Sequence, residues 1–246
     1  MLRSDISFAN GNRAATVHAQ TTATGSEILH ALDIPSCQSV LVVSGGASGI
    51  SPDILPLVER LLVDGVAQAV AEDGIAVVDG GTQAGVMQAI GEGRARVGGV
   101  APLIGVCPAA RVSWPGGPAG ASLRLLEPNH THFVLTPGEH WGDETPFMFS
   151  LVETLCRSAP SLAILINGGS VAQQEVLWNI RQQRTVIVVQ GSGRLADLVA
   201  DVWLNKIPPL DAEIATIIQS GRMILFDSCR EPGDLALLIR SRLAHQ

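Results

Sequence analysis

The stretch Ile75-Ala-Val-Val-Asp-Gly-Gly-Thr-Gln-Ala-Gly-Val-Met87 shows the unit from which this chain is built. Four apolar residues lead through an aspartate and two glycines into a segment with helical periodicity over about 84–96. An apolar run without polar alternation is typical of a strand covered on both faces, as in a parallel sheet. Glycine after such a strand lets the backbone turn sharply into the next helix. The stretch therefore predicts a strand, a tight turn and a helix.

The same unit recurs along the chain. Apolar runs predict strands at 40–43, 75–78, 103–106, 132–135, 162–166 and 186–189, with a seventh at 223–226. Helical periodicity predicts helices at about 52–72, 84–96, 144–158, 171–181, 194–201, 211–220 and 231–243. Alternation of strand and helix predicts an α/β fold: a Rossmann-like, doubly wound and mainly parallel sheet of about seven strands. We expect residues 1–246 to form a single domain, because no low-complexity linker interrupts the pattern.

Local signals mark two boundaries and one irregular segment. Ser51 is expected to cap the first helix, with Pro52 at its first position, and Asp211 precedes a later helix with an acid that suits the helix dipole. The Gly- and Pro-rich stretch from Pro108 to Pro128 predicts a long surface loop, a feature that is often functional in compact domains.

Four of the predicted strands run into glycine-rich turns, at 43–49, 79–85, 166–170 and 190–194. A single such turn indicates only a change of direction. In an open parallel sheet, however, all of them lie outside the carboxyl ends of the strands, where ligands bind. Together they offer backbone N–H groups and the hydroxyls of Ser44, Ser48, Thr82, Ser170 and Ser192. The pattern predicts an anion site made of dipoles, for a phosphate- or nucleotide-type ligand.

Composition narrows the chemistry. Of 246 residues, 46% are apolar and 16% charged, which is typical of a compact globular protein and excludes a disordered chain. Lys206 is the only lysine and no glycine precedes it, so a Gly-Lys-Ser/Thr phosphate loop is excluded and pyridoxal-phosphate chemistry is disfavoured. Tyrosine is absent and cannot act as acid or base. A net charge of −7 with scattered arginines argues against nucleic acid as a partner.

Targeting and redox signals point to the cytoplasm. The N-terminus has no apolar segment of a signal peptide, and no stretch reaches 18 apolar residues without a break, so no membrane association is predicted. The four cysteines form no C-x-x-C pair and are interpreted as reduced thiols. No cofactor is expected to be required, apart from a bound nucleotide-type ligand.

Four blocks of sequence carry a resemblance to a known family. They are Val-Ser-Gly-Gly at 43–46, Asp-Gly-Gly-Thr-Gln-Ala-Gly-Val-Met at 79–87, Leu-Glu-Pro-Asn-His-Thr-His-Phe-Val-Leu at 126–135 and Gln-Gly-Ser-Gly-Arg-Leu-Ala-Asp at 190–197. In this order they resemble the SLOG-type (LSDAT) domain of melastatin-type TRP channels, and more specifically its free-standing prokaryotic relatives. The resemblance spans about residues 38–230 and implies a Rossmann-like fold that recognises nucleotide-derived ligands such as ADP-ribose.

The wider SLOG group includes LOG enzymes, which hydrolyse nucleoside monophosphates to a base and ribose phosphate and carry P-G-G-x-G-T-x-x-E. The matching stretch here is Asn-Gly-Gly-Ser-Val-Ala-Gln-Gln-Glu at 167–175. The glycine pair and Glu175 are retained, whereas Val171 and Ala172 replace glycine and threonine. These changes are expected to remove a flexible backbone position and a hydroxyl that faces phosphate. If the chain is an enzyme, the resemblance and the need of glycosidic chemistry for a carboxylate point to Glu175.

The histidines of the third block allow several roles. His130 and His132 lie two apart at a predicted strand start, so both can face one side, and Asn129 suits the preceding turn. Imidazoles with nearby carboxylates have acceptable spacing for zinc, but the resemblance carries no metal, and none is predicted. Contact with the ligand and a purely structural role both remain open.

Three further residues have two interpretations each. Arg194 opens the helix after the fourth glycine turn, where its guanidinium suits a diphosphate, although a surface salt bridge would explain it equally. Asp79 at a strand end can hold ribose hydroxyls or cap its own turn. Trp141, in the polar segment 138–145, can stack on a base or mark a subunit contact.

The sequence as a whole predicts a non-catalytic sensor of an ADP-ribose-like nucleotide derivative. The alternatives are a LOG-like N-glycosidase that uses Glu175 and a purely structural oligomerisation module. A homo-oligomer and an effector protein that receives the signal are the expected partners. The predicted ligand-binding residues are Ser44, Gly45, Gly46, Asp79, Gly80, Gly81, Thr82, Gly85, Asn129, His130, His132, Gly168, Gly169, Ser170, Gly191, Ser192, Gly193 and Arg194.

Overall fold

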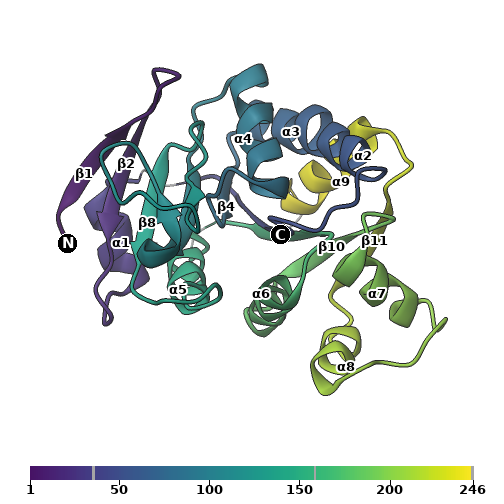
Figure 1. The fold of residues 1–246 in the computed structure, drawn as a ribbon. Helices are drawn as coiled ribbons and strands as arrows, with labels where there is room; N and C mark the ends of the chain where they lie inside the picture. The colour runs from purple at the N-terminus through teal and green to yellow at the C-terminus, as the bar shows by residue number, and fades with distance from the viewer. Residues whose placement is uncertain (35–36, 158, 245–246) are drawn as a thin grey trace.

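The computed structural model describes residues 1–34, 37–157 and 159–244 (Figure 1). Within these ranges the centre of the molecule is a nine-stranded sheet in the order β1-β2-β8-β5-β4-β3-β9-β10-β11. Neighbouring strands are parallel except for the antiparallel pair of β1 and β2. The strands are β1 (Arg3–Ser7), β2 (Arg13–His18), β3 (Val40–Gly45), β4 (Ala76–Asp79), β5 (Leu103–Pro108), β8 (His132–Thr136), β9 (Ser161–Ile166), β10 (Thr185–Gln190) and β11 (Met223–Asp227).

Helices cover both faces of this sheet (Figure 1). One layer contains α1 (Gly25–Leu32), α5 (Thr145–Leu155), α6 (Ser170–Arg181), α7 (Arg194–Trp203) and α8 (Ala212–Gln219). The other contains α2 (Leu55–Leu61), α3 (Ala67–Asp73), α4 (Gly85–Val97) and α9 (Pro232–Ala244), with a π-helical turn, Leu62–Val66, joining α2 to α3. The predicted Rossmann-like α/β fold with a mainly parallel sheet is therefore confirmed. In the described ranges no helix is long and apolar enough to span a membrane.

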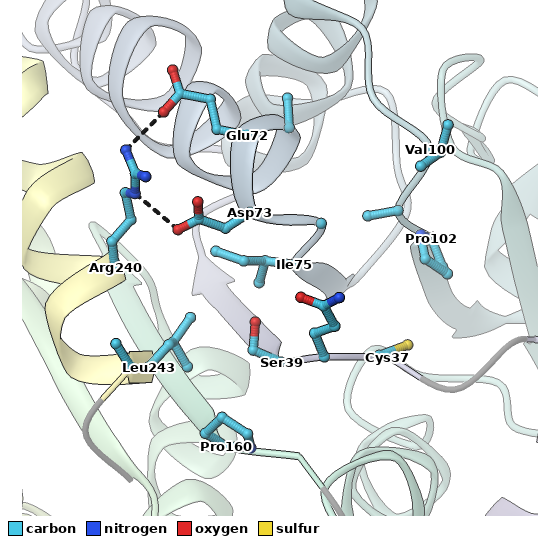
Figure 2. Close-up of a pocket in the computed structure, with 15 residues that line it drawn as sticks. Cys37, Ser39, Glu72, Asp73, Ile75, Val100, Pro102, Pro160, Arg240 and Leu243 are labelled. Carbon is cyan, nitrogen blue, oxygen red and sulfur yellow. Dashed lines mark hydrogen bonds and ion pairs between the residues drawn. The ribbon is translucent and has the colours of Figure 1, made fainter.

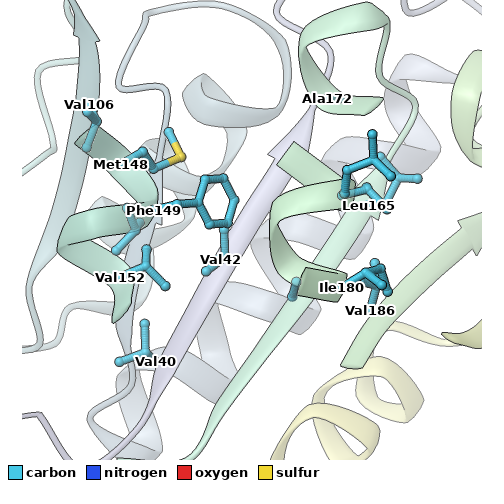
Figure 3. Close-up of a cluster of buried hydrophobic side chains, with 14 of the residues drawn as sticks. Val40, Val42, Val106, Met148, Phe149, Val152, Leu165, Ala172, Ile180 and Val186 are labelled. Atoms are coloured by element: carbon cyan, nitrogen blue, oxygen red, sulfur yellow. The ribbon is translucent and has the colours of Figure 1, made fainter. Parts of the chain in front are cut away.

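The core is divided by the pleat of the central strands. Along β3, Val40 and Val42 face the layer of α5 and α6, and Leu41 and Val43 face the opposite layer. Figure 3 shows the buried cluster on the side of α5 and α6, in which Phe149 of α5 lies over Val40 and Val42. All four β3 side chains are at most 2% exposed. Burial on both faces explains why the strand is a continuous apolar run.

The N-terminal part of the sheet was missing from the sequence-based prediction, which placed no element before residue 40 and expected about seven strands. β1 and β2 form a hairpin at the edge of the sheet, and within β1 Ile6 is the one buried residue. An edge strand with a single buried side chain has no apolar run to reveal it. The α1 helix that follows is short but has a complete capping box between Thr24 and Glu27.

The helix boundaries correct one prediction and confirm another. Ser51 does not cap the first helix: α2 begins at Leu55, and the Ser51 carbonyl accepts N–H groups of a preceding turn. Asp211 does cap α8, because its carboxylate accepts the Ile214 N–H at 2.7 Å. The helix predicted over 144–158 ends at Leu155, and residue 158 lies outside the described residues.

The stretch from Pro108 to Pro128 is only partly the surface loop that was predicted. Residues 118–122 are exposed, but the ends of the stretch fold inward. A short helical turn (Ala109–Arg111) precedes a two-stranded parallel pair, β6 (Val112–Ser113) and β7 (Arg124–Leu125). Val112 and Leu126 are buried in a third apolar cluster with Phe133. The ends of the stretch therefore cover one face of the sheet over β5 and β8.

Close backbone packing fixes the turn after β4. Gly81 has a left-handed φ of +65°, and a Cβ at this position would lie 2.7 Å from the Gly105 Cα and 3.0 Å from the Phe133 ring. Neighbouring Gly80 has a different environment, because a Cβ there would meet nothing closer than Met87 at 3.9 Å. Gly81 is therefore required by the core, and Gly80 leaves open space.

We expect Gly81→Ala to lower the free energy of unfolding by at least about 2 kcal/mol, because it adds overpacking to an unfavourable φ. Gly80→Ala should cost less than about 1 kcal/mol. Chemical denaturation of both variants and the unchanged protein measures the difference. Equal losses in the two variants would contradict the packing described for Gly81.

Candidate functional site

The carboxyl ends of β3, β4 and β9 surround a cavity of about 340 Å³. The chain proceeds from β3 to β4 on one side and later places β9 on the other side of β3. Such a reversal of strand order leaves a crevice at which ligands bind in open α/β sheets. The cavity is lined by Val43, Gly45, Gly46, Ala47, Ser48, Gly80, Thr82, Met87, Arg124, Trp141, Glu144, Gly169, Ser170, Val171, Ala172, Glu175 and Arg194.

One side of the cavity is suited to an anion. The first turn of α6, Ser170 to Ala172, lines it, and the N–H groups of a first turn have no carbonyl partner four residues back in the helix. The Arg194 guanidinium lies beside this turn: it donates to the Ser48 carbonyl at 2.9 Å, and a Cβ on Gly169 would lie 2.7 Å from its Nη2. Helix dipole and guanidinium therefore act on the same volume.

Asn167 holds the glycine turns together. It is 1% exposed, with φ at +57°, and its backbone N–H and its Nδ2 both donate to Ser192, each at 2.8 Å. Its carbonyl accepts the Ala196 N–H at 3.0 Å. On the opposite side, a Cβ on Gly46 would lie 2.6 Å from the Asn167 Oδ1. The turns after β3, β9 and β10 thus meet on one buried amide.

Two buried carboxyl groups form the other side of the cavity. Glu175, on the second turn of α6, is 7% exposed, and Glu144, immediately before α5, is 4% exposed. Burial raises the pKa of Glu175 to about 8 against the opposing effect of the Ser44 hydroxyl, and the charges of Glu144 and Asp79 raise it further. Burial likewise raises the pKa of Glu144 to about 7, although its Oε2 accepts the Gly142 N–H at 2.6 Å. Both groups therefore titrate near neutral pH.

Polar and aromatic groups complete the lining. The Thr82 hydroxyl is buried and has no hydrogen-bond partner among the described residues. The Ser44 Oγ makes no hydrogen bond of good geometry with those residues either, although it lies near enough to the Glu175 carboxyl to favour its ionised form. Trp141 lines the cavity with the Arg111 guanidinium 5.8 Å from its ring centre. Thr82 and Trp141 thus add a hydroxyl-bearing and an aromatic residue to the lining, whereas Ser44 lies outside it.

His130 lies behind this cavity in a buried ion network. Its Nδ1 lies 2.7 Å from Glu127 Oε2 and its Nε2 lies 2.9 Å from Asp79 Oδ1. Burial alone would lower the pKa of His130, but the two carboxylates, Asp79 foremost, raise it to about 9. The imidazolium donates to both acids, and Asp79 Oδ1 also accepts the Gly81 N–H at 2.7 Å. The network therefore anchors the turn after β4 to the segment that precedes β8.

The other residues of this segment also have protein partners. Asn129 donates to Glu127 from its backbone and from Nδ2 at 2.9 and 2.6 Å, and its Oδ1 accepts Asn12 Nδ2 at 3.0 Å. Burial and the charges of Arg3 and Arg94 lower the pKa of His132 to about 4, so this imidazole is neutral. No group of three metal-ligating side chains occurs in the described parts of the chain.

The structure brings only part of the predicted site to the cavity. Gly45, Gly46, Gly80, Thr82, Gly169, Ser170, Glu175 and Arg194 line it. In the described ranges, the other predicted residues lie outside the lining: Ser44, Asp79, Gly81, Gly85, Asn129, His130, His132, Gly168, Gly191, Ser192 and Gly193. Several of these residues pack against the lining residues and hold them in position. Gly85, for example, lets α4 approach the Gly46 carbonyl, which accepts the Val86 N–H at 3.1 Å.

The expected effect of Val171 on the turn is corrected. Val171 lies in the first turn of α6, where a valine adopts the helical backbone without strain, and the left-handed conformations fall on Asn167 and Gly168 instead. Loss of the family's glycine at 171 therefore does not distort the loop. Ala172 does line the cavity, so the hydroxyl that the threonine of the LOG pattern would supply is absent from it.

Sequence reasoning missed Glu144, Arg124 and Asn167 as parts of the site. Glu144 lies in the segment 138–145, which was singled out for Trp141, but neither its burial nor its proximity to α6 is encoded locally. Asn167 stands where the LOG pattern has proline, and this difference alone did not indicate that its side chain is buried between the turns. A polar residue between an apolar strand and a glycine pair was the available signal, because asparagine tolerates the left-handed conformation.

A larger hollow of about 740 Å³ lies at the opposite edge of the sheet (Figure 2). Its lining includes Ser39, Ile75 and Pro102, the residues immediately before β3, β4 and β5. Figure 2 shows the Arg240 guanidinium bound to the carboxylates of Glu72 and Asp73, both at 2.8 Å. Its arginine is thus already neutralised, and no glycine-rich turn offers free N–H groups among the lining residues that the structure describes. The smaller cavity is the better candidate site.

The His130 network should make stability depend on pH. Its pKa rises from about 6.5 in the unfolded chain to about 9 in the folded one, so the stabilisation is complete below pH 6.5 and is lost as pH rises through 9. The full effect is on the order of 3 kcal/mol. Denaturation of the unchanged protein and of His130→Gln between pH 6 and 9.5 measures it. The difference in unfolding free energy between the two proteins should become smaller as the pH rises. A difference that stays constant with pH would contradict a charged His130.

Comparison with known proteins identifies the family of the chain. No curated protein matches the chain. A family model described as "SLOG in TRPM, prokaryote" (LSDAT_prok) matches residues 38–236, most of the chain, including every strand from β3 to β11 and every residue that lines the cavity. The N-terminal hairpin and α1 lie outside the match. The chain therefore belongs to the prokaryotic SLOG family related to the domain found in TRPM proteins.

Proposed function

We propose that this chain is a sensor domain that binds a phosphorylated nucleotide derivative, ADP-ribose-like, in the cavity at the ends of β3, β4 and β9. The observation that carries the proposal is the convergence of the α6 N-terminus and the Arg194 guanidinium on one cavity. Both favour a phosphate group, and neither requires lysine, of which the chain has one.

The size of the cavity sets how the ligand is accommodated. At about 340 Å³ it lies near the lower end of the range for small-molecule sites, roughly 300–1,000 Å³. One nucleotide unit fills such a volume, with phosphate at α6 and the base toward Trp141. The second sugar of an ADP-ribose-like ligand extends from the cavity past Ser48 and Arg194. A sensor of this kind passes its signal to a second copy of the chain or to an effector protein.

A LOG-like N-glycosidase is the second candidate, and Glu175 is the observation in its favour. The carboxyl group lines the cavity, and its pKa of about 8 keeps it protonated at neutral pH. A protonated carboxylic acid can donate its proton to the departing base as the glycosidic bond breaks. Ala172 in place of threonine argues against this activity, because the phosphate loses a hydroxyl donor.

Arg194→Ala should weaken binding of AMP and ADP-ribose by about 1.5–3 kcal/mol, as expected for a hydrogen bond between charged groups. Adenosine, which has no phosphate, should lose little. Titration calorimetry measures these affinities, with Arg242→Ala on the exposed face of α9 as a matched control. Equal losses for AMP and adenosine would contradict the placement of phosphate at Arg194.

We expect the unchanged protein to release no base from nucleoside monophosphates while ADP-ribose raises its melting temperature in a saturable manner. Chromatography of the reaction and thermal denaturation give the two readouts. Ala172→Thr, which restores a hydroxyl to the first turn of α6, should tighten AMP binding.

Release of adenine on the order of 1 per second, abolished in Glu175→Gln, would overturn the sensor proposal and establish the glycosidase. Absence of any thermal shift with AMP or ADP-ribose would overturn both and favour a purely structural module.

A further inference from the structure

We propose that Glu144 and Glu175 act as a carboxyl pair that binds the vicinal hydroxyls of a ribose. This inference rests on the proposed function, because it assigns the sugar of the same phosphorylated ligand. It adds Glu144 as a residue that determines specificity.

The two carboxyl groups reach one cavity from different elements. Glu175 comes from α6, and Glu144 comes from the residue immediately before α5. The Gly142 N–H fixes Glu144 by donating to its Oε2 at 2.6 Å. The same loop lies close to the first turn of α6, since a Cβ on Gly142 would lie 3.8 Å from the Val171 side chain. Glu144 is therefore held at the cavity before a ligand arrives.

The distance from the anion-binding turn suits a sugar phosphate. Glu175 follows Val171 by four residues, so it lies on the same face of α6 about one turn, ~5.4 Å, further along. The phosphate and the ring hydroxyls of a ribose 5-phosphate are separated by a length of the same order. A phosphate at the helix N-terminus therefore places the ribose hydroxyls beside the pair.

A diol fits the pair better than a cation does. Arg124 and Arg194 line the same cavity, so a cationic ligand would approach two guanidinium groups. A neutral diol avoids this repulsion and supplies two O–H donors to buried carboxyl oxygens, which otherwise lack the solvation of water. Thr82, whose buried hydroxyl has no hydrogen-bond partner among the described residues, lines the same cavity.

Binding of a diol should release protons. Hydroxyl donors stabilise the ionised carboxyl, so they lower pKa values that now lie near 7 for Glu144 and 8 for Glu175. The charged neighbours of the pair are Asp79 and Asp143, which raise these values, the His130 imidazolium behind Asp79, and Arg124 and Arg194 in the lining. Buried Cys107 is neutral, because its thiol pKa is raised well above the ordinary value. Affinity for the diol should therefore increase from pH 6.5 to 8.5.

The test compares AMP with 2′,3′-dideoxyadenosine monophosphate, which shares the base and phosphate but lacks the diol. Titration calorimetry at pH 7.5 in HEPES and in Tris buffer gives affinity and proton release, and chromatography of the recovered nucleotide checks that it is intact. The unchanged protein should bind AMP at least about tenfold more tightly, the difference expected for hydrogen bonds to charged groups, and should release protons only with AMP.

Glu144→Gln should reduce both the AMP preference and the proton release severalfold, whereas Glu153→Gln, an exposed change on α5, should leave both unchanged. A merely structural Glu144 would weaken the two nucleotides equally and leave the preference intact, which would overturn the inference. Equal binding of both nucleotides to the unchanged protein would also overturn it while leaving the proposed function standing. Failure to bind AMP or ADP-ribose at all would overturn the proposed function, and this inference with it.

Discussion

The buried amide of Asn167 is the constraint on which the cavity depends. It lies where β9 ends, between the turns that follow β3 and β10, and its three hydrogen bonds reach Ser192 and Ala196. A buried polar group with several partners fixes one arrangement, because each lost bond would leave an unsatisfied donor or acceptor. The first turn of α6 and Arg194 both follow from this arrangement, since the turns that carry them are joined by one side-chain and two backbone hydrogen bonds of Asn167.

Charge in this region is divided into two separate buried sets. Behind the turn after β4, Asp79 and Glu127 lie on either side of the His130 ring and raise its pKa to about 9, so the imidazolium is held between two acids. In the cavity, Glu144 and Glu175 have no facing cation at hydrogen-bond distance among the described residues, and burial shifts them toward the neutral form. The first set stabilises the loop, and the second is available to a ligand.

Parts of the site could be predicted because they follow directly from the strands. Glycines after apolar runs identified the turns at Gly45, Gly80 and Gly169, and these do line the cavity. The roles of Gly81 and His130 could not be predicted in the same way. Gly105 beside Gly81 and Asp79 beside His130 come from other segments, and only the folded structure shows that one position lies in the core and the other in an ion network. Glu144 is a further case, because its proximity to Glu175 depends on how α5 and α6 pack.

The sequence by itself determined the parallel α/β sheet, the helices that follow β3, β4, β8, β9, β10 and β11, and the family, because these depend on local periodicity and on contiguous motifs. The tertiary structure alone decided the N-terminal hairpin, whose edge strand has one buried side chain, and the division of the glycine turns into lining and support. It also decided the pKa values of the buried groups. Burial raises the pKa of Glu144 and of Glu175, whereas the pKa of His130 is raised by Asp79, which lies 51 residues away in the sequence.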